Sequence, residues 1–74
     1  MQNTEENLMY TELDLFDYYR YVAFGIDQER LEEIVLNMLR EQFGDELVEE
    51  NYDDLVEEIA FKYNVAFKTL ELVN

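Results

Sequence analysis

The sequence predicts a small all-α domain of three to four helices that spans residues 1–74. Apolar residues recur at spacings of three and four along most of the chain, which is the pattern of one face of an α-helix. The two glycines, Gly25 and Gly44, each follow such a stretch, at the position where a helix commonly ends in the left-handed conformation. From Asp45 to Glu58, pairs of acids alternate with pairs of mostly apolar residues, and this period of four lies close to the helical repeat of about 3.6.

The first helix is expected over residues 12–24. Thr11 and Asp14 resemble a capping pair, because a hydroxyl accepts a hydrogen bond from an early helical N–H and an acid in the first turn complements the helix dipole. Gly25 then ends the helix. The apolar positions that recur at three and four are Leu15, Tyr18, Tyr19, Val22 and Ala23.

The second helix is expected to begin after Asp27, which suits the N-cap position, and to end at Phe43, just before Gly44. An apolar stripe runs along this helix and predicts the face that packs on the core. Its members are Leu31, Ile34, Val35, Met38 and Leu39. On the opposite face, Arg30 is expected to pair with Glu33 at helical spacing.

The acidic repeat of residues 45–58 admits two interpretations. One continuous helix would carry the paired acids on a ridge that drifts slowly around it. Alternatively, Asn51 caps a helix of its own, and residues 45–50 form a short turn of helix before it. Asn64, which tolerates the left-handed conformation, is expected to end the last long helix and leave residues 65–73 as a short helix or strand. If that segment pairs as a strand with an N-terminal segment, the fold is a small α+β arrangement instead.

The composition is that of a folded protein with a strong charge bias. The chain is 49% hydrophobic, with six tyrosines, five phenylalanines and no proline, whereas a disordered acidic tail would be poor in aromatics. Nineteen acids against five bases give a formal net charge of −14, which repels DNA, RNA and anionic lipid. No apolar run approaches the roughly 20 residues needed to span a bilayer, and residues 1–6 do not resemble a signal peptide. We therefore expect a cytoplasmic protein that makes no membrane contact.

The residue types that catalysis most often uses are missing from the sequence. Without cysteine and histidine there is no thiolate nucleophile, no imidazole base and almost no structural zinc site. Residues 45–58 lack the alternating oxygen ligands and the glycine of a calcium loop, and a chain this short rarely builds the cleft that a pair of glycosidase carboxylates needs. The two glycines lie too far apart for a phosphate-binding loop. We expect no enzyme activity, no cofactor and no metal.

Helical acids in this repeat would have a charge spacing like that of nucleic acid. Four residues of helix rise about 6 Å and carry two acids, or one per ~3 Å, while a DNA strand carries one phosphate per ~3.4 Å. Such a helix can occupy the groove of a basic protein and replace its counterions. The predicted contact residues are Asp45, Glu46, Glu49, Glu50, Asp53, Asp54, Glu57 and Glu58, with Glu29, Glu32 and Glu33 as a second row. The expected partner is a basic nucleic-acid-binding protein rather than nucleic acid itself.

In charge, length and aromatic content, the chain resembles the small acidic inhibitors made by phages and other mobile elements. These include anti-CRISPR, antirestriction and uracil-DNA glycosylase inhibitor proteins, which often imitate DNA. The resemblance implies an inhibitor that blocks the DNA- or RNA-binding groove of a nuclease or another DNA-processing protein. If a phage encodes it, the protein would act in the cytoplasm of the host cell. The resemblance rests on no sequence motif, so it transfers no site residue by position.

Residues 56–73 are similar to a helix-turn-helix, which offers an alternative function as a transcriptional regulator. In this interpretation Ala60 is the small residue at the helix crossing and Asn64 stands in the turn. The expected buried positions are Ile59, Val65, Leu70 and Val73. The outward positions, which would read DNA, are Ala66, Phe67, Lys68 and Glu71. They contain a single base, and this composition does not favour DNA.

The aromatic residues exceed what one small core can readily hide, so some are expected at an interface. The candidates are Tyr10, Tyr18, Tyr19, Tyr21, Phe24, Phe61 and Phe67. An acidic oligomerising adaptor without any link to nucleic acid, such as a homodimer, is therefore a third alternative.

Overall fold

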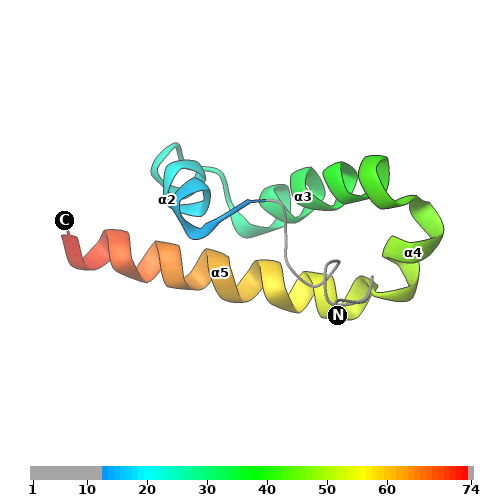
Figure 1. The fold of residues 1–74 in the computed structure, drawn as a ribbon. Helices are drawn as coiled ribbons and strands as arrows, with labels where there is room; N and C mark the ends of the chain where they lie inside the picture. The colour runs from blue at the N-terminus through cyan, green and yellow to red at the C-terminus, as the bar shows by residue number, and fades with distance from the viewer. Residues whose placement is uncertain (1–12, 74) are drawn as a thin grey trace, which may run out of the picture.

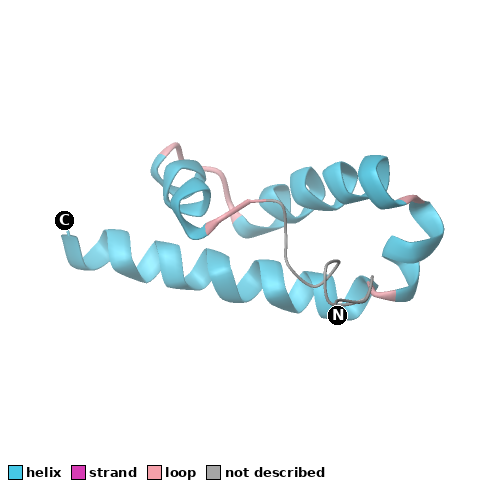
Figure 2. Cartoon of the chain, in the orientation of Figure 1, coloured by secondary structure: helices cyan, strands magenta, loops and turns pink. Residues whose placement is uncertain are grey.

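The computed structural model describes residues 13–73, which form four helices and no strand. The helices are α2 (Leu15–Ala23), α3 (Gln28–Phe43), α4 (Asp45–Glu50) and α5 (Tyr52–Val73). The long helix α5 forms one side of the molecule, α2 and α3 lie along its other side, and α4 reverses the chain at one end (Figure 1). Short loops join the helices (Figure 2). The predicted all-α fold is confirmed, and the α+β alternative with a strand at residues 65–73 is wrong.

The first described helix begins at Leu15 rather than at residue 12 as predicted. Asp14 is its N-cap, because the Asp14 carboxylate accepts the backbone N–H of Asp17 at 3.1 Å. The Asp17 carboxylate in turn accepts the backbone N–H of Asp14 at 3.4 Å. This reciprocal capping box sets the start of α2. Thr11, the predicted capping partner, lies outside the described residues.

Both ends of α3 lie where the sequence predicts them. The Asp27 carboxylate accepts the backbone N–H of Arg30 at 2.9 Å and caps the helix. At the other end, Gly44 donates its N–H to the carbonyl of Arg40 at 2.8 Å. Gly44 has a φ of 94° and Gly25, after α2, has a φ of 85°, a region that side-chain-bearing residues rarely adopt. The helix ends predicted from the two glycines are therefore confirmed.

Asn51 interrupts the acidic repeat, as the second interpretation of residues 45–58 predicts. Its side-chain amide donates a hydrogen bond to the Leu47 carbonyl at the end of α4, at 2.9 Å. Its own carbonyl accepts the N–H of Leu55 in α5, also at 2.9 Å. Asn51 thus satisfies a carbonyl of one helix and starts the hydrogen-bond ladder of the next. The single continuous ridge is wrong, because α4 and α5 run in different directions from this residue (Figure 1).

The helix α5 runs through Asn64 without a turn, so the helix-turn-helix interpretation of residues 56–73 is wrong. Asn64 is exposed in the middle of the helix. Beside it, the hydroxyl of Tyr63 donates a hydrogen bond to the Ile26 carbonyl at 3.1 Å, which ties this part of α5 to the loop between α2 and α3. Ala66, predicted to face outward, is fully buried. The buried face continues on both sides of Asn64, and this packing favours a continuous helix over a turn.

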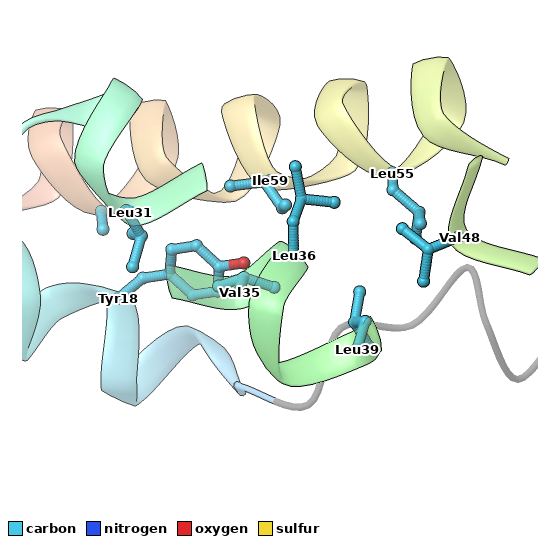
Figure 3. Packing of buried hydrophobic residues seen from close by; sticks show 9 residues of the cluster. Tyr18, Leu31, Val35, Leu36, Leu39, Val48, Leu55 and Ile59 are labelled. Carbon is cyan, nitrogen blue, oxygen red and sulfur yellow. The ribbon is translucent and has the colours of Figure 1, made fainter. Parts of the chain in front are cut away.

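All four helices contribute to one buried cluster, which is shown in Figure 3. Its members are Tyr18, Leu31, Val35, Leu36, Leu39, Val48, Leu55, Ile59 and Ala66. Tyr18, one of the aromatics expected at an interface, lies fully inside this core. On α3 the predicted stripe is largely confirmed, but Leu36 is buried while Ile34 and Met38 are only partly buried. The reason is that α3 packs against both α4 and α5, which shifts its buried face toward Leu36.

Candidate acidic interface

Charge is divided unevenly between the two ends of the molecule. Residues 27–58, which include α3, α4 and the start of α5, carry thirteen acids and two bases. In contrast, α2 together with residues 60–73 carries two acids and three bases. Helix α4 lies at one end of the fold, whereas α2 and the C-terminal part of α5 lie at the other (Figure 1). The acids of α4 and of the start of α5 therefore concentrate negative charge where α4 reverses the chain, while those of residues 27–33 lie at the start of α3, away from α4.

The eight acids of residues 45–58 form a surface that we call the acidic corner. Its members are Asp45, Glu46, Glu49 and Glu50 on α4, and Asp53, Asp54, Glu57 and Glu58 on the first two turns of α5. Seven of them are exposed, and Glu58 is partly buried. The structure brings them together around one end of the molecule, on two helix axes rather than on one ridge.

Two acids of the acidic corner are engaged by bases. Glu49 pairs with Arg40 of α3 at an N···O distance of 3.3 Å, and Glu58 pairs with Lys62, one turn further along α5, at 3.7 Å. Within residues 13–73, the other six acids make no ion pair. A lysine or arginine of a partner could approach these six carboxylates without breaking an existing ion pair of the described chain.

Four of the acids have an additional role in the fold. Asp45 and Glu46 lie in the first turn of α4, and Asp53 and Asp54 lie in the first turn of α5, where negative charge offsets the positive end of the helix dipole. The pattern of the sequence therefore reflects helix stability as well as surface charge. The other two acids without an ion pair among the described residues are Glu50 and Glu57, and they have no such position in a first turn.

The predicted second row of acids lies on the first half of α3. Glu32 is partly buried and accepts a hydrogen bond from the side-chain amide of Gln28 at 3.1 Å. Glu33 pairs with Arg30 at 3.8 Å, which confirms the pair predicted from their spacing. The described lining of an open hollow of about 470 Å³ consists of Asp27, Glu29, Arg30, Glu32, Glu33 and Tyr52. Tyr52 is the first residue of α5 and precedes Asp53 of the acidic corner, but none of the eight acids of the corner is in this described lining.

Exposed aromatics lie next to α2 and along α5 beyond the acidic corner. Of the aromatics expected at an interface, Phe24 and Phe61 are 77% and 66% exposed, and Phe67 is exposed to a smaller degree. Tyr19 and Tyr21 are partly buried. Tyr10 lies outside the described residues. The expectation of an aromatic surface is therefore confirmed for the phenylalanines but not for the tyrosines of α2.

The strong exposure of Phe16 and Leu72 was not predicted. Phe16 is 68% exposed on α2, and Leu72 is 88% exposed near the end of α5. For Phe16 the signal was present, because this residue falls outside the apolar repeat of its helix. A groove of about 360 Å³ also opens between α2 and the C-terminal part of α5. It is lined by Val22, Ala23, Phe67, Leu70 and Glu71.

The described residues hold no group of three or more acids arranged to bind a metal ion. Of the helices in the described part of the chain, none combines the length and the apolar character that crossing a bilayer requires. The chain matches no protein-family model, no curated protein and no solved structure.

Proposed function

We propose that this protein binds a basic nucleic-acid-binding protein through the acidic corner and blocks the groove in which that partner holds DNA or RNA. The observation that carries the proposal is the grouping, around one end of the molecule, of six exposed acids that make no ion pair within residues 13–73. The protein acts by occupying a site rather than by catalysis. It uses no cofactor and no metal.

The charge density of the acidic corner suits a groove built for nucleic acid. Residues 45–58 contain eight acids and no base. Along each helix axis this amounts to about one acid per 2.3 Å, somewhat denser than the ~3.4 Å between phosphates of a DNA strand. Because α4 is only six residues long, its run of acids covers about 9 Å before the chain changes direction at Asn51. The partner therefore meets two short acidic runs, one on each helix.

The relative orientation of these two runs is held by the core. Val48 of α4 and Leu55 of α5 are both fully buried, and they lie close to each other in the core (Figure 3). The Asn51 side chain adds a hydrogen bond at the junction. A preorganised surface loses less conformational entropy on binding than a flexible acidic tail does. The fold thus supports recognition of a specific groove as well as general attraction to positive charge.

The alternative of a DNA-binding regulator loses its main support. That alternative depended on a turn at Asn64, and α5 is continuous there. Ala66, one of its four outward residues, is buried. Direct binding to nucleic acid is also opposed by the net charge of −14.

The proposal can be tested with two double charge reversals that change the net charge by the same amount. Glu50→Lys/Glu57→Lys alters the acidic corner, whereas Glu41→Lys/Glu71→Lys alters exposed acids outside it. A tagged form of the parent protein is used to capture its partner from a lysate. We then test whether the parent protein displaces DNA or RNA from the captured partner. For a single partner molecule in solution, where dimerisation adds no affinity, we expect the corner variant to bind at least about tenfold more weakly, a loss of about 1.4 kcal/mol, and the control variant to bind as the parent does.

Salt provides a second readout. Between about 0.1 and 1 M salt the Debye length falls from about 10 to 3 Å, so binding carried by exposed acids should weaken strongly. Circular dichroism of each variant establishes that its helices are intact. Equal loss of binding in both variants, or a partner that keeps its nucleic acid when bound, would overturn the proposal.

A further inference from the structure

The outer face of α5 carries an apolar stripe. Phe61, Val65, Lys68 and Leu72 follow one another at spacings of four, three and four residues, which places them along one side of the helix. We call these four residues the α5 stripe. Phe61 and Leu72 are strongly exposed, Lys68 is exposed and Val65 is partly buried. Two large apolar side chains of the same helix face are thus left in solvent by the described part of the chain.

The spacing of the α5 stripe is that of a helix–helix seam. Alternating steps of four and three are those of the a and d positions of a coiled coil, in which a single polar residue is tolerated and sets the register. The opposite side of α5 already packs in the core through Leu55, Ile59 and Ala66. Helices α2 and α3 lie along that side (Figure 1). The helix therefore has a second face with the pattern of a packing surface, and the described chain does not cover it.

Charge indicates which molecule can cover this face. The first seven residues of α5 carry four acids and no base, whereas residues 60–73 carry two bases and one acid. A basic protein would be drawn to the acidic corner and away from Lys68. Each copy has a net charge of −14, so a second copy of this chain is repelled overall, and it is repelled least at this end.

We propose that two copies of the protein associate through their α5 stripes, with the two α5 helices antiparallel. In a register centred between residues 65 and 68, Phe61 meets Leu72 of the second copy, and Val65 meets the aliphatic stem of Lys68 of the second copy. The Lys68 ammonium reaches solvent at the edge of the seam. The stripe is thus complementary to itself, and the antiparallel arrangement keeps the two acidic corners at opposite ends of the dimer.

The flanking residues fit the same register. Asn64 and Glu71 lie on one side of the α5 stripe, seven residues apart, so each faces the other across the two-fold axis. The Asn64 amide can then donate a hydrogen bond to the carboxylate of Glu71 in the second copy, once on each side of the axis. Within the contact no two acids oppose each other. A contact of twelve helical residues is about 18 Å long, which is small for a stable interface, so we expect a dissociation constant in the micromolar range.

Sedimentation equilibrium tests the association directly. The parent protein is measured from roughly 1 to 500 μM, which brackets a micromolar constant, together with Phe61→Glu and Phe24→Glu. Both substitutions place the same charge at an exposed phenylalanine, but only Phe61 belongs to the α5 stripe. We expect the parent to dimerise, Phe61→Glu to raise the dissociation constant at least about tenfold, and Phe24→Glu to behave as the parent does. A parent that is monomeric throughout, or equal effects of the two substitutions, would overturn the proposal.

Salt separates this proposal from the proposed function. Added salt screens the repulsion between two acidic copies, so dimerisation should strengthen, whereas binding to a basic partner should weaken. Each proposal can therefore fail without the other. Dimerisation that weakens steeply with salt would contradict an apolar seam.

Cross-linking tests the orientation, because the chain has no native cysteine. Val65→Cys and Lys68→Cys are prepared as separate variants and oxidised alone and as a mixture. The antiparallel register brings position 65 of one copy to position 68 of the other, so the mixture should form a disulfide-linked heterodimer far faster than either variant cross-links with itself. Rapid cross-linking of each variant alone would indicate a parallel pair and overturn the proposed arrangement.

Discussion

Lys62 lies between an acid and an aromatic ring, and its replacement by glutamine measures how much these contacts contribute to stability. Its ammonium is 3.7 Å from the Glu58 carboxylate and 6.0 Å from the ring centroid of Tyr18, which is fully buried. The side chain of Lys62 is only 20% exposed, so both contacts are partly shielded from water. Glutamine keeps a long side chain with a similar helix propensity and removes the charge.

The expected loss follows from these two contacts. An exposed ion pair at a spacing of four helical residues contributes about 0.3–0.5 kcal/mol to the free energy of unfolding. A cation about 6 Å from the centre of an aromatic ring, near the limit for this interaction, adds roughly 0.5 kcal/mol. The free energy of unfolding should therefore fall by about 1 kcal/mol. For a domain of this size, that loss lowers the midpoint of thermal unfolding by about 4–8 °C.

Lys68→Gln, measured like Lys62→Gln at a protein concentration below the dissociation constant of the proposed dimer, is the matched control. Lys68 lies on the same helix, is exposed, and makes no ion pair within residues 13–73. Both substitutions make the chain one unit more negative, so the increase in general self-repulsion is nearly the same and only the local contacts differ. At about 1 M salt the shared repulsion is screened, but the difference between the variants should remain, since partly buried pairs are screened much less. Equal unfolding midpoints for the two variants under both conditions would refute the reasoning.

Two further substitutions test the geometry that supports the acidic corner and the long helix. Gly44→Ala should lower the free energy of unfolding, measured in urea, by about 1–3 kcal/mol, because φ 94° and ψ 154° are almost restricted to glycine. No neighbouring atom lies within 4 Å of an added Cβ, so the loss would report backbone strain rather than a clash. An unchanged free energy of unfolding would contradict this reasoning. Tyr63→Phe should cost about 1 kcal/mol in the same assay by removing the hydrogen bond to the Ile26 carbonyl, while Tyr52→Phe, at a more exposed tyrosine, should cost little. Similar losses for both tyrosines would count against a role for that bond.

The helix ends could be predicted because their chemistry is local. The caps at Asp27 and Gly44 depend on hydrogen bonds to residues three or four positions away, and such spacings are visible in the sequence. The two asparagines of the C-terminal half show where this reasoning stops. Asn51 breaks the chain into two helices, whereas Asn64 lies inside one, although both residues are asparagines.

What separates these two asparagines is their packing in the folded molecule. At Asn51 the side chain bonds back to α4, and Val48 and Leu55 on either side of the break are both buried. Near Asn64, Tyr63 is bonded to a carbonyl 37 residues earlier in the chain, and Ala66 is buried. Contacts of that length are not readable from a local pattern, so tertiary packing decided between helix and turn.

The candidate site shows the same division between local and distant information. The number and spacing of the acids at residues 45–58 could be read from the sequence, because charge depends only on residue type. The sequence does not show that Glu49 forms an ion pair, since its partner Arg40 lies on another helix, nine residues away. The separation of an acidic end from a nearly neutral aromatic end also depends on how α2 packs against the second half of α5.

The acidic corner and the α5 stripe share helix α5, and this placement sets how a dimer would engage its partner. The start of α5 is about 14 residues from the centre of the proposed antiparallel contact, so the two helix starts, with their acidic corners, would be about 44 Å apart in a dimer. A single groove shorter than that can meet only one acidic corner, and the dimer would hold two partner molecules. On a surface that carries many copies of the partner, two simultaneous contacts should raise the apparent affinity by roughly 10²-fold or more. Phe61→Glu, which leaves the acidic corner unchanged, should remove this gain and keep the affinity measured for a single partner in solution. If Phe61→Glu instead weakened both measurements equally, the stripe would be part of the partner-binding surface and the two sites would not be separate.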